Sequence, residues 1–281
     1  MKASPPRRPP PSLRASGRSS KSTVRCAAGW KTRWQSWVDA MERIMTYETL
    51  RWYAYVNDKI CKQPIRGVVV AFFGFGNQTR YTEDPVEGEF YGDRGILYVY
   101  PYNNPWNRMN RQAVDYTDEV LDVLFAHYGM DEKTPIVASG GSMGGQGALT
   151  YMVYAKRTPV ACVANCPVCD MVGHWNARED LPRSFYSAAY GYPGSFEEAL
   201  RSLSPLHLAD RMPDADYHIF HCTEDRVVPK ALHSDKLVPA LRASGRRVTY
   251  DVVEGRGHCS LTLAAKEKYA AYILAAFPEK A

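Results

Sequence analysis

The sequence lacks any long apolar run. Among its 281 residues the longest nearly apolar stretch, Val68 to Phe75, covers only about eight positions, whereas a helix that crosses a membrane needs roughly 20. We find no internal repeat and no room for a second large domain. Hydrophobic residues make up 45% of the chain, enough to fill a sizeable core. A disordered or fibrous protein is excluded, and we expect a soluble one without a membrane span.

Cysteine is scarce. The chain has seven cysteines, an odd number, and they are scattered along its length. This pattern favours free thiols in a reducing compartment over a disulfide framework, so we expect a cytoplasmic protein. Cys166 and Cys169 form a Cys-x-x-Cys pair that invites a redox or zinc interpretation. Because no second ligand pair accompanies it, we favour structural thiols and expect neither a metal nor a cofactor.

Acidic residues are absent from positions 1–38, which carry nine Lys or Arg. The other 26 basic residues face 30 acidic ones, so the rest of the chain carries a net charge of −4 and does not require a nucleic-acid partner. Residues 1–28 are rich in Pro, Arg and Ser without apolar periodicity, which predicts a disordered leader. It lacks the apolar region of a secretory signal and resembles an organellar transit peptide. The alternative is an extension outside the working protein.

Residues 29–46 place apolar side chains on one stripe of a predicted helix. The stripe consists of Trp30, Trp34, Trp37, Val38, Met41, Ile44 and Met45. A basic amphipathic helix can lie on a membrane surface. We favour docking on the protein's own domain or on a second subunit, which would make a homo-oligomer.

From residue 47 to the end of the chain, short β-rich runs alternate with helical patterns, which indicates one α/β domain with a mainly parallel sheet. We predict strands over residues 50–56, 67–73, 95–100, 135–139, 160–164, 217–221 and 248–253. We predict helices over residues 109–128, 144–156, 196–203, 232–243 and 263–277. Residues 170–193 break the alternation and are predicted to form an inserted loop or small cap.

The strongest chemical signal follows the predicted strand 135–139, in the run Gly140-Gly141-Ser142-Met143-Gly144-Gly145. Gly-x-Ser-x-Gly between a strand and a helix is typical of a nucleophile elbow, where glycines let the backbone bend sharply and expose the serine. A glycine-rich turn of this kind could also cradle a phosphate. No Lys-Ser or Lys-Thr pair follows the glycines, which argues against a P-loop.

A serine nucleophile needs an imidazole base and a carboxylate that orients it, here expected in the order serine, acid, histidine. His258 fits best, because it lies in a glycine-bounded loop after the strand 248–253, where parallel sheets keep their chemistry. The strand 217–221 is followed by two adjacent carboxylates, Glu224 and Asp225, of which we choose Asp225. Cys222 and Cys259 flank the acid and the base, so thiol reagents are expected to inhibit.

The chain resembles the α/β-hydrolase family, and within it the catalytic domain of the prolyl oligopeptidase family. The resemblance covers roughly residues 47–277. It rests on the elbow, on Ser204-Pro205, on the pattern His221-x-x-x-Asp225-x-x-Val228-Pro229 and on the loop Glu254-Gly255-x-Gly257-His258. It implies a mostly parallel, doubly wound sheet with helices on both faces. It also implies that Ser142 is the nucleophile, His258 the general base and Asp225 its orienting acid.

The resemblance further implies an oxyanion hole built from backbone N–H groups. The donors would be Met143 and, in the turn Phe73-Gly74-Phe75-Gly76, Phe75 with Gly76 as the alternative. The family usually has histidine where this chain has Phe73. Its large members also carry a β-propeller, which 281 residues cannot hold, so an esterase or a small exopeptidase is as well supported as an oligopeptidase.

Substrate contacts are predicted in the loop after the strand 95–100, where Asn103, Asn104 and Trp106 offer amides and an aromatic face suited to sugar esters or aromatic acyl groups. Asn and Pro are also common in loops simply because both residues favour turns. His174 in the inserted segment is a further candidate contact. The sequence thus predicts a serine hydrolase that cleaves an ester or amide through an acyl-enzyme. The competing hypothesis is a catalytically inactive relative that serves as a binding or scaffold protein.

Overall fold

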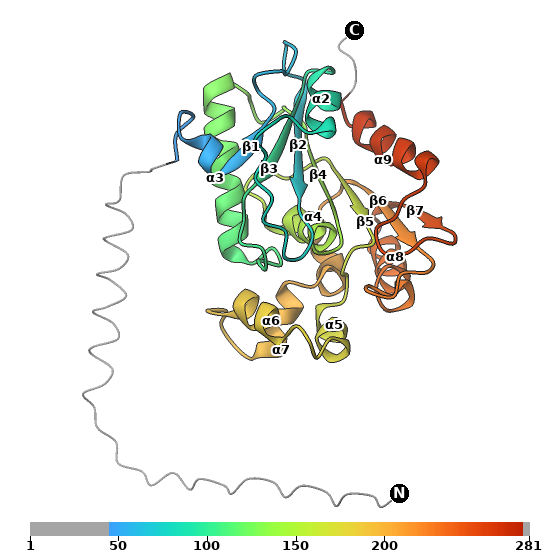
Figure 1. Ribbon diagram of the computed structural model, residues 1–281. Helices are drawn as coiled ribbons and strands as arrows, with labels where there is room; N and C mark the ends of the chain where they lie inside the picture. The colour runs from blue at the N-terminus through green and yellow to red at the C-terminus, as the bar shows by residue number, and fades with distance from the viewer. Residues whose placement is uncertain (1–44, 278–281) are drawn as a thin grey trace, which may run out of the picture. The chain divides into compact units, whose positions relative to one another are not determined.

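The computed structural model describes residues 45–277. The predicted leader and all but the last two residues of the predicted helix over 29–46 lie outside this range. Seven strands form one sheet in the order β1-β3-β2-β4-β5-β6-β7 (Figure 1). Only β1 runs antiparallel to its neighbour. The strands are β1 (Ala54–Val56), β2 (Gly67–Phe72), β3 (Ile96–Pro101), β4 (Ile136–Gly141), β5 (Ala161–Asn165), β6 (Asp216–Cys222) and β7 (Arg247–Val253).

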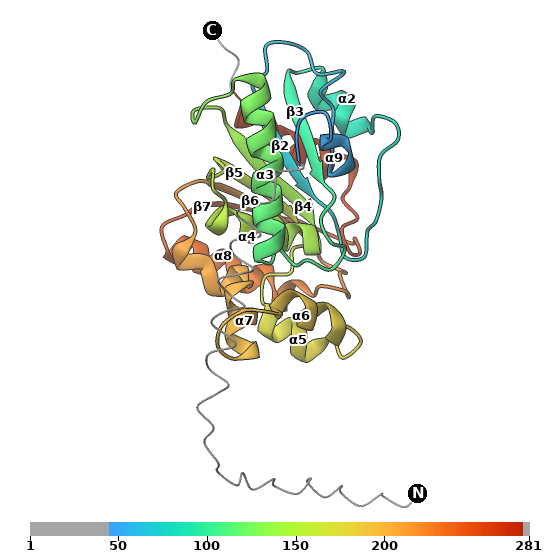
Figure 2. The same ribbon diagram turned by 90° about the vertical axis from the view of Figure 1, so that its left-hand side faces the viewer.

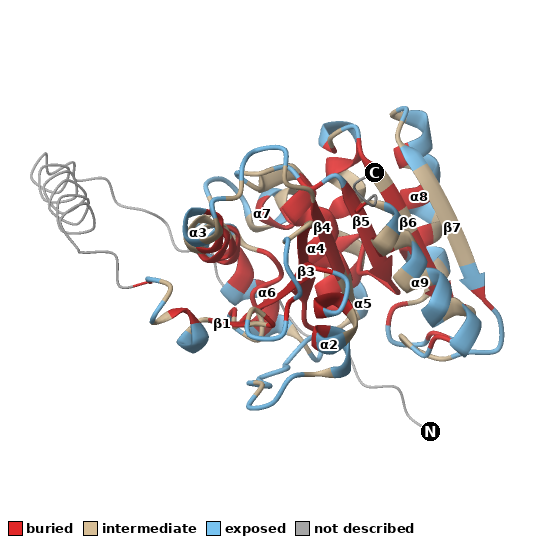
Figure 3. Ribbon diagram, turned by 90° about the horizontal axis from the view of Figure 1, so that it is seen from above, coloured by how far each residue is buried: buried red, intermediate tan, exposed pale blue. Residues whose placement is uncertain are grey.

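Helices cover both faces of the sheet, because successive side chains of a strand point to opposite faces. In β2, for example, Val68 and Val70 belong to one hydrophobic core and Val69 to the other. The first core is closed by α3 (Arg111–Tyr128), α4 (Met143–Tyr154) and α8 (Ser234–Ala243), and the second by α2 (Val86–Gly92) and α9 (Leu263–Ala275). Figure 3 shows the central strands buried, whereas the edge strand β7 is partly exposed. The predicted α/β-hydrolase fold is confirmed.

The inserted segment folds into a small helical cap. It contains α5 (Met171–Ala177) and α6 (Pro182–Ala189), and α7 (Phe196–Ser202) packs with them at one end of the sheet (Figures 1 and 2). Met171, Phe185 and Leu200 are buried in a third hydrophobic core that these helices share. The sequence prediction of a loop or cap over 170–193 is therefore resolved in favour of a cap.

One predicted strand needs correction at its start, and one short helix is missing from the predictions. Residues Leu50–Trp52 form a 3₁₀ turn and not the start of a strand, because pairing with β3 begins only where Ala54 lies opposite Pro101. Helix α2 was not predicted, since its seven residues are too few to reveal a period. Short 3₁₀ segments at Pro205–Arg211 and Lys230–Leu232 complete the described elements. No helix within residues 45–277 is both long and apolar enough to cross a membrane.

Candidate active site

Ser142 stands in a sharp turn between β4 and α4. Its backbone adopts φ 58° and ψ −124°, a strained conformation that non-glycine residues rarely take and that occurs mostly at functional sites. The chain must also pass very close to β2 here. A Cβ atom on Gly144 would lie 2.1 Å from the carbonyl oxygen of Phe72, so only glycine fits at this position. The sequence expectation of a nucleophile elbow matches this geometry.

His258 and Asp225 meet at the carboxyl ends of β6 and β7. The Nδ1 atom of His258 lies 2.6 Å from Oδ2 of Asp225. The other carboxylate oxygen accepts the backbone N–H groups of Val227 at 2.9 Å and Val228 at 2.8 Å. Glu224, the alternative acid, is exposed. The structure therefore brings together the two residues that the sequence paired, and it separates them from the neighbouring carboxylate.

The Asp225 carboxylate stays ionised despite its burial. Its side chain is fully buried, and desolvation alone would raise the pKa. The neighbouring His221 and His258 and the Val228 N–H outweigh that effect and hold the pKa of Asp225 well below its usual range. An ionised acid of this kind fixes the proton of His258 on Nδ1 and leaves Nε2 as the basic atom.

Asn165, at the end of β5, connects the elbow to the His258 loop, and no motif in the sequence singles it out. Its carbonyl oxygen accepts the Ser142 N–H at 2.9 Å, and its side chain donates to the carbonyl oxygen of Cys259 at 3.2 Å. No hydrogen bond joins the Ser142 hydroxyl to His258 in the described chain. The Nε2 atom instead lies 3.8 Å from the Cys259 thiol.

The backbone N–H groups of the three predicted oxyanion-hole residues differ in their hydrogen bonds. Neither Met143 nor Phe75 donates its N–H to an acceptor within residues 45–277. The Gly76 N–H is donated to the carbonyl oxygen of Pro105 at 2.9 Å. This contact occupies the N–H of Gly76, the alternative donor, whereas the N–H of Phe75 has no acceptor among the described residues. The assignment of Met143 and Phe75 to an oxyanion hole stays a prediction.

The predicted substrate contacts lie in the loop after β3 and in the cap. Asn103 is buried and donates to the Thr117 hydroxyl at 3.2 Å. Asn104 accepts the Trp106 N–H at 3.0 Å, a turn role of the kind that makes asparagine common in loops. His174 lies inside the cap, where burial lowers the pKa of its imidazole to about 2. Asn104 is exposed, Asn103 borders a surface pocket, and the Arg183 guanidinium lies 4.8 Å from the ring centre of Trp106. Their role as substrate contacts stays a prediction.

Arg108 connects the loop after β3 to the cap, and no motif in the sequence pointed to it. It is only 1% exposed, and its Nε donates to the Ser184 hydroxyl at 3.2 Å. The guanidinium carbon lies 4.1 Å from the ring centre of Phe185 and 5.6 Å from that of Phe75. No carboxylate of the described residues pairs with it, and burial lowers its pKa to about 9. Arg108 thus holds the turn that carries the Phe75 N–H against the cap.

The Cys166–Cys169 pair does not act as a unit in the structure. Cys169 is buried and faces the Ser234 hydroxyl at 3.9 Å. Cys166 turns the other way, and the pKa of its thiol is raised first by a hydrogen bond with the Cys259 thiol and then by burial. All described cysteines are free thiols.

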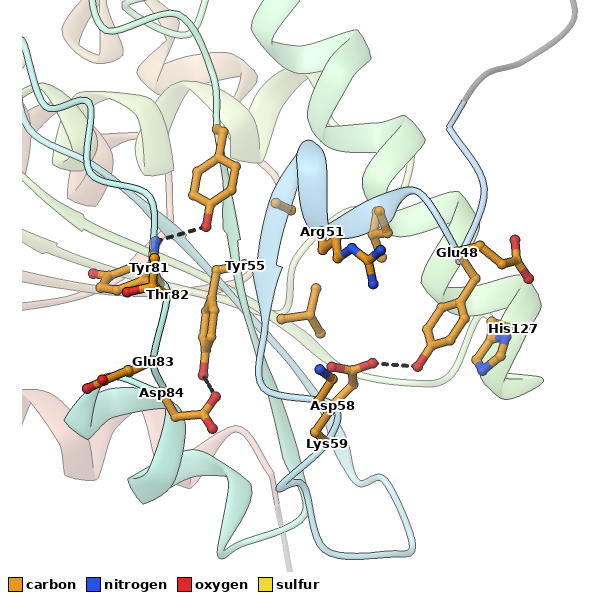
Figure 4. A pocket seen from close by; sticks show the side chains of 15 residues that line it. Glu48, Arg51, Tyr55, Asp58, Lys59, Tyr81, Thr82, Glu83, Asp84 and His127 are labelled. Carbon is orange, nitrogen blue, oxygen red and sulfur yellow. Dashed lines mark hydrogen bonds between the residues drawn. The ribbon is translucent and has the colours of Figure 1, made fainter.

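A separate cavity of about 830 Å³ lies near the β1 edge of the sheet (Figure 4). Two pairs of its polar side chains are hydrogen-bonded to each other: Tyr55 donates to Asp84 at 2.6 Å, and the Tyr47 hydroxyl donates to Asp58. None of the residues Ser142, Asp225 and His258 lines it. The cavity therefore does not compete with the elbow as the candidate active site.

The fold and the elbow define an α/β-hydrolase, and solved structures of that fold are similar to this chain. A peptidase from Mycobacterium tuberculosis that hydrolyses puromycin is 21% identical, with a TM-score of 0.61, over 77% of this chain and 34% of its own. An acylaminoacyl peptidase from Pyrococcus horikoshii is 13% identical, with a TM-score of 0.61, over 76% and 38%. A truncated carbohydrate esterase from gut microbiota is 19% identical, with a TM-score of 0.58, over 75% and 86%.

The sequence profile of the prolyl oligopeptidase family matches residues 102–280. The chain therefore belongs to the prolyl oligopeptidase family of serine hydrolases, as the resemblance predicted. It spans about a third of the length of the peptidases to which it is similar. No curated protein sequence matches it.

Proposed function

We propose that this protein hydrolyses an ester or an amide through an acyl-enzyme formed on Ser142. The observation that carries the proposal is the 2.6 Å contact between His258 Nδ1 and Asp225 Oδ2, because a carboxylate bound at Nδ1 leaves Nε2 as the basic atom that a serine nucleophile requires. A hydroxyl is a poor nucleophile unless such a base takes its proton.

The proposed reaction has two halves. The Ser142 oxygen attacks the carbonyl carbon of the substrate while His258 Nε2 accepts the hydroxyl proton. The Met143 and Phe75 N–H groups stabilise the oxyanion, and a donor of this kind contributes about 3 to 4 kcal/mol. His258 then protonates the departing alcohol or amine. Water hydrolyses the acyl-enzyme in the second half, with His258 again as the base.

The missing hydrogen bond between Ser142 and His258 is compatible with this role. Catalytic hydrogen bonds are often long in the absence of substrate and tighten in the reacting complex.

Esters and amides are both compatible with this geometry. The similar structures include peptidases and an esterase, and all are too distant in sequence to choose between them. A panel of p-nitrophenyl esters measured against aminoacyl and prolyl p-nitroanilides would identify the preferred bond. We expect turnover in at least one of the two classes.

Labelling with a fluorophosphonate probe tests the proposal directly. The probe should label the wild-type protein on Ser142, as mapped by mass spectrometry, and should fail to label Ser142→Ala or the heat-unfolded protein. Ser139→Ala serves as the matched control. Ser139 is a buried residue of β4, the strand that leads into the elbow, and its replacement should leave the label in place. A folded wild-type protein that takes no label would support the competing hypothesis of an inactive binding protein.

A further inference from the structure

Three metal-binding side chains surround the basic nitrogen of the candidate active site. The sulfur atoms of Cys166 and Cys259 and the Nε2 atom of His258 all lie within 4.8 Å of one another. In a tetrahedral zinc site the bond lengths are about 2.3 Å to sulfur and about 2.0 to 2.1 Å to nitrogen, which places the ligand atoms roughly 3.6 to 3.8 Å apart. The measured distance from Cys259 Sγ to His258 Nε2 is 3.8 Å. Small side-chain rotations would therefore complete a three-ligand site.

The surroundings of these ligands also match those of a metal site. A histidine that binds a metal usually donates its other ring N–H to a carboxylate, which fixes the ring and its tautomer. Asp225 forms this contact with His258 at 2.6 Å. Cys166 Sγ accepts the backbone N–H of Cys222 at 3.4 Å, a contact that holds the sulfur atom in place. Two of the three ligands are thus oriented before any ion arrives.

An ion can reach the three ligands from solvent. His258 and Cys259 are partly exposed, whereas Cys166 is buried behind them. Three protein ligands leave a fourth tetrahedral position open for water. Thiolate and imidazole ligands together favour zinc and other soft divalent ions over magnesium or calcium.

We propose that Cys166, Cys259 and His258 bind a zinc ion that inhibits the enzyme. The ion would occupy the Nε2 lone pair of His258, which the proposed reaction needs in order to accept the Ser142 proton. The inhibition rests on the proposed function, whereas the binding of the ion does not.

Cadmium titration tests the binding without any enzyme assay. Cd²⁺ should produce the ultraviolet charge-transfer band of cadmium bound to thiolates in the wild-type protein. Cys259→Ser, Cys166→Ala and His258→Gln should each weaken Cd²⁺ binding by about 100-fold or more, since loss of an outer-shell contact alone costs about 10- to 100-fold. Cys61→Ser is the matched control, because Cys61 is a buried free thiol outside the cluster, and it should leave the binding unchanged.

Zinc inhibition of ester hydrolysis supplies the second measurement. Zn²⁺ should inhibit the wild-type enzyme, EDTA should restore the rate, and Cys259→Ser should need about 100-fold more Zn²⁺ for the same fractional inhibition. Each variant is compared with its own rate in EDTA, and circular dichroism checks its fold. Because Cys259 is partly exposed, its variant keeps the test valid even if Cys166→Ala fails to fold.

The outcomes distinguish the two proposals. Unchanged Cd²⁺ affinity in folded Cys259→Ser would overturn the metal site, even if fluorophosphonate labels Ser142 and the enzyme is active. If Cd²⁺ binding depends on all three ligands but the protein takes no fluorophosphonate label, the metal site is supported and the proposed function is refuted.

Discussion

Replacing Asp225 with asparagine tests the proposed triad at its most buried member. One carboxylate oxygen accepts the N–H groups of Val227 and Val228, and the other contacts His258 Nδ1. In Asp225→Asn the amide oxygen must take the first position, because an NH₂ group there would face two N–H donors. The NH₂ group then points at Nδ1, which has to act as an acceptor. The imidazole proton moves to Nε2, where it prevents transfer of the Ser142 proton.

The expected loss follows from this change of tautomer. The same substitution in a serine protease lowers kcat by about 10⁴, which corresponds to about 5.4 kcal/mol of transition-state stabilisation. Glu224→Gln provides the control, because Glu224 neighbours Asp225 in sequence but is exposed. It should change the rate by less than about tenfold and the free energy of unfolding by no more than about 0.5 kcal/mol.

Initial rates on a p-nitrophenyl ester, together with thermal unfolding of each variant, would measure both effects. The reasoning fails if folded Asp225→Asn keeps its kcat/KM within about tenfold of the wild type. If Glu224→Gln is instead the more damaging substitution, the acid has been assigned to the wrong carboxylate.

Three further predictions concern the elbow, the cap and the leader. Gly144→Ala should destabilise the fold by about 3 kcal/mol or more in chemical unfolding, because its Cβ would meet the Phe72 carbonyl at 2.1 Å. Gly147→Ala in the same helix should cost far less, because the nearest atom to its Cβ would be the flexible end of the Met109 side chain, at 3.2 Å, and equal losses would contradict the close approach. His174 has its pKa lowered to about 2 from 6.5, so the unfolded chain binds more protons below pH 6.5 and stability falls as the pH drops from there, by up to about 1.4 kcal/mol per unit. His174→Phe should reduce that slope between pH 6 and 4, and an unchanged slope would refute this account. Deleting residues 1–28 should leave kcat/KM within about twofold, and a tenfold loss would show that the leader contributes to the active site.

Much of the fold could be predicted because its signals are local. The β-rich runs, such as Val68 to Phe72, alternate between two buried faces and therefore read as apolar throughout. The glycines around Ser142 mark a turn that other residues cannot make. The order of serine, acid and histidine follows from the order of the strands. The sequence by itself therefore determined the strand and helix pattern, the elbow and the identity of three residues that could form a triad.

The tertiary structure determines which side chains and backbone groups from distant parts of the chain contact one another. The family pattern favours Asp225 over Glu224, and the structure adds that Asp225 is buried against His258 whereas Glu224 is exposed. The N–H of Gly76 differs from that of Phe75 because a distant carbonyl, that of Pro105, occupies it. Cys166 has a sequence partner three residues away, yet its thiol contacts Cys259. Contacts of this kind depend on how strands far apart in the chain are brought side by side, and no local pattern encodes them.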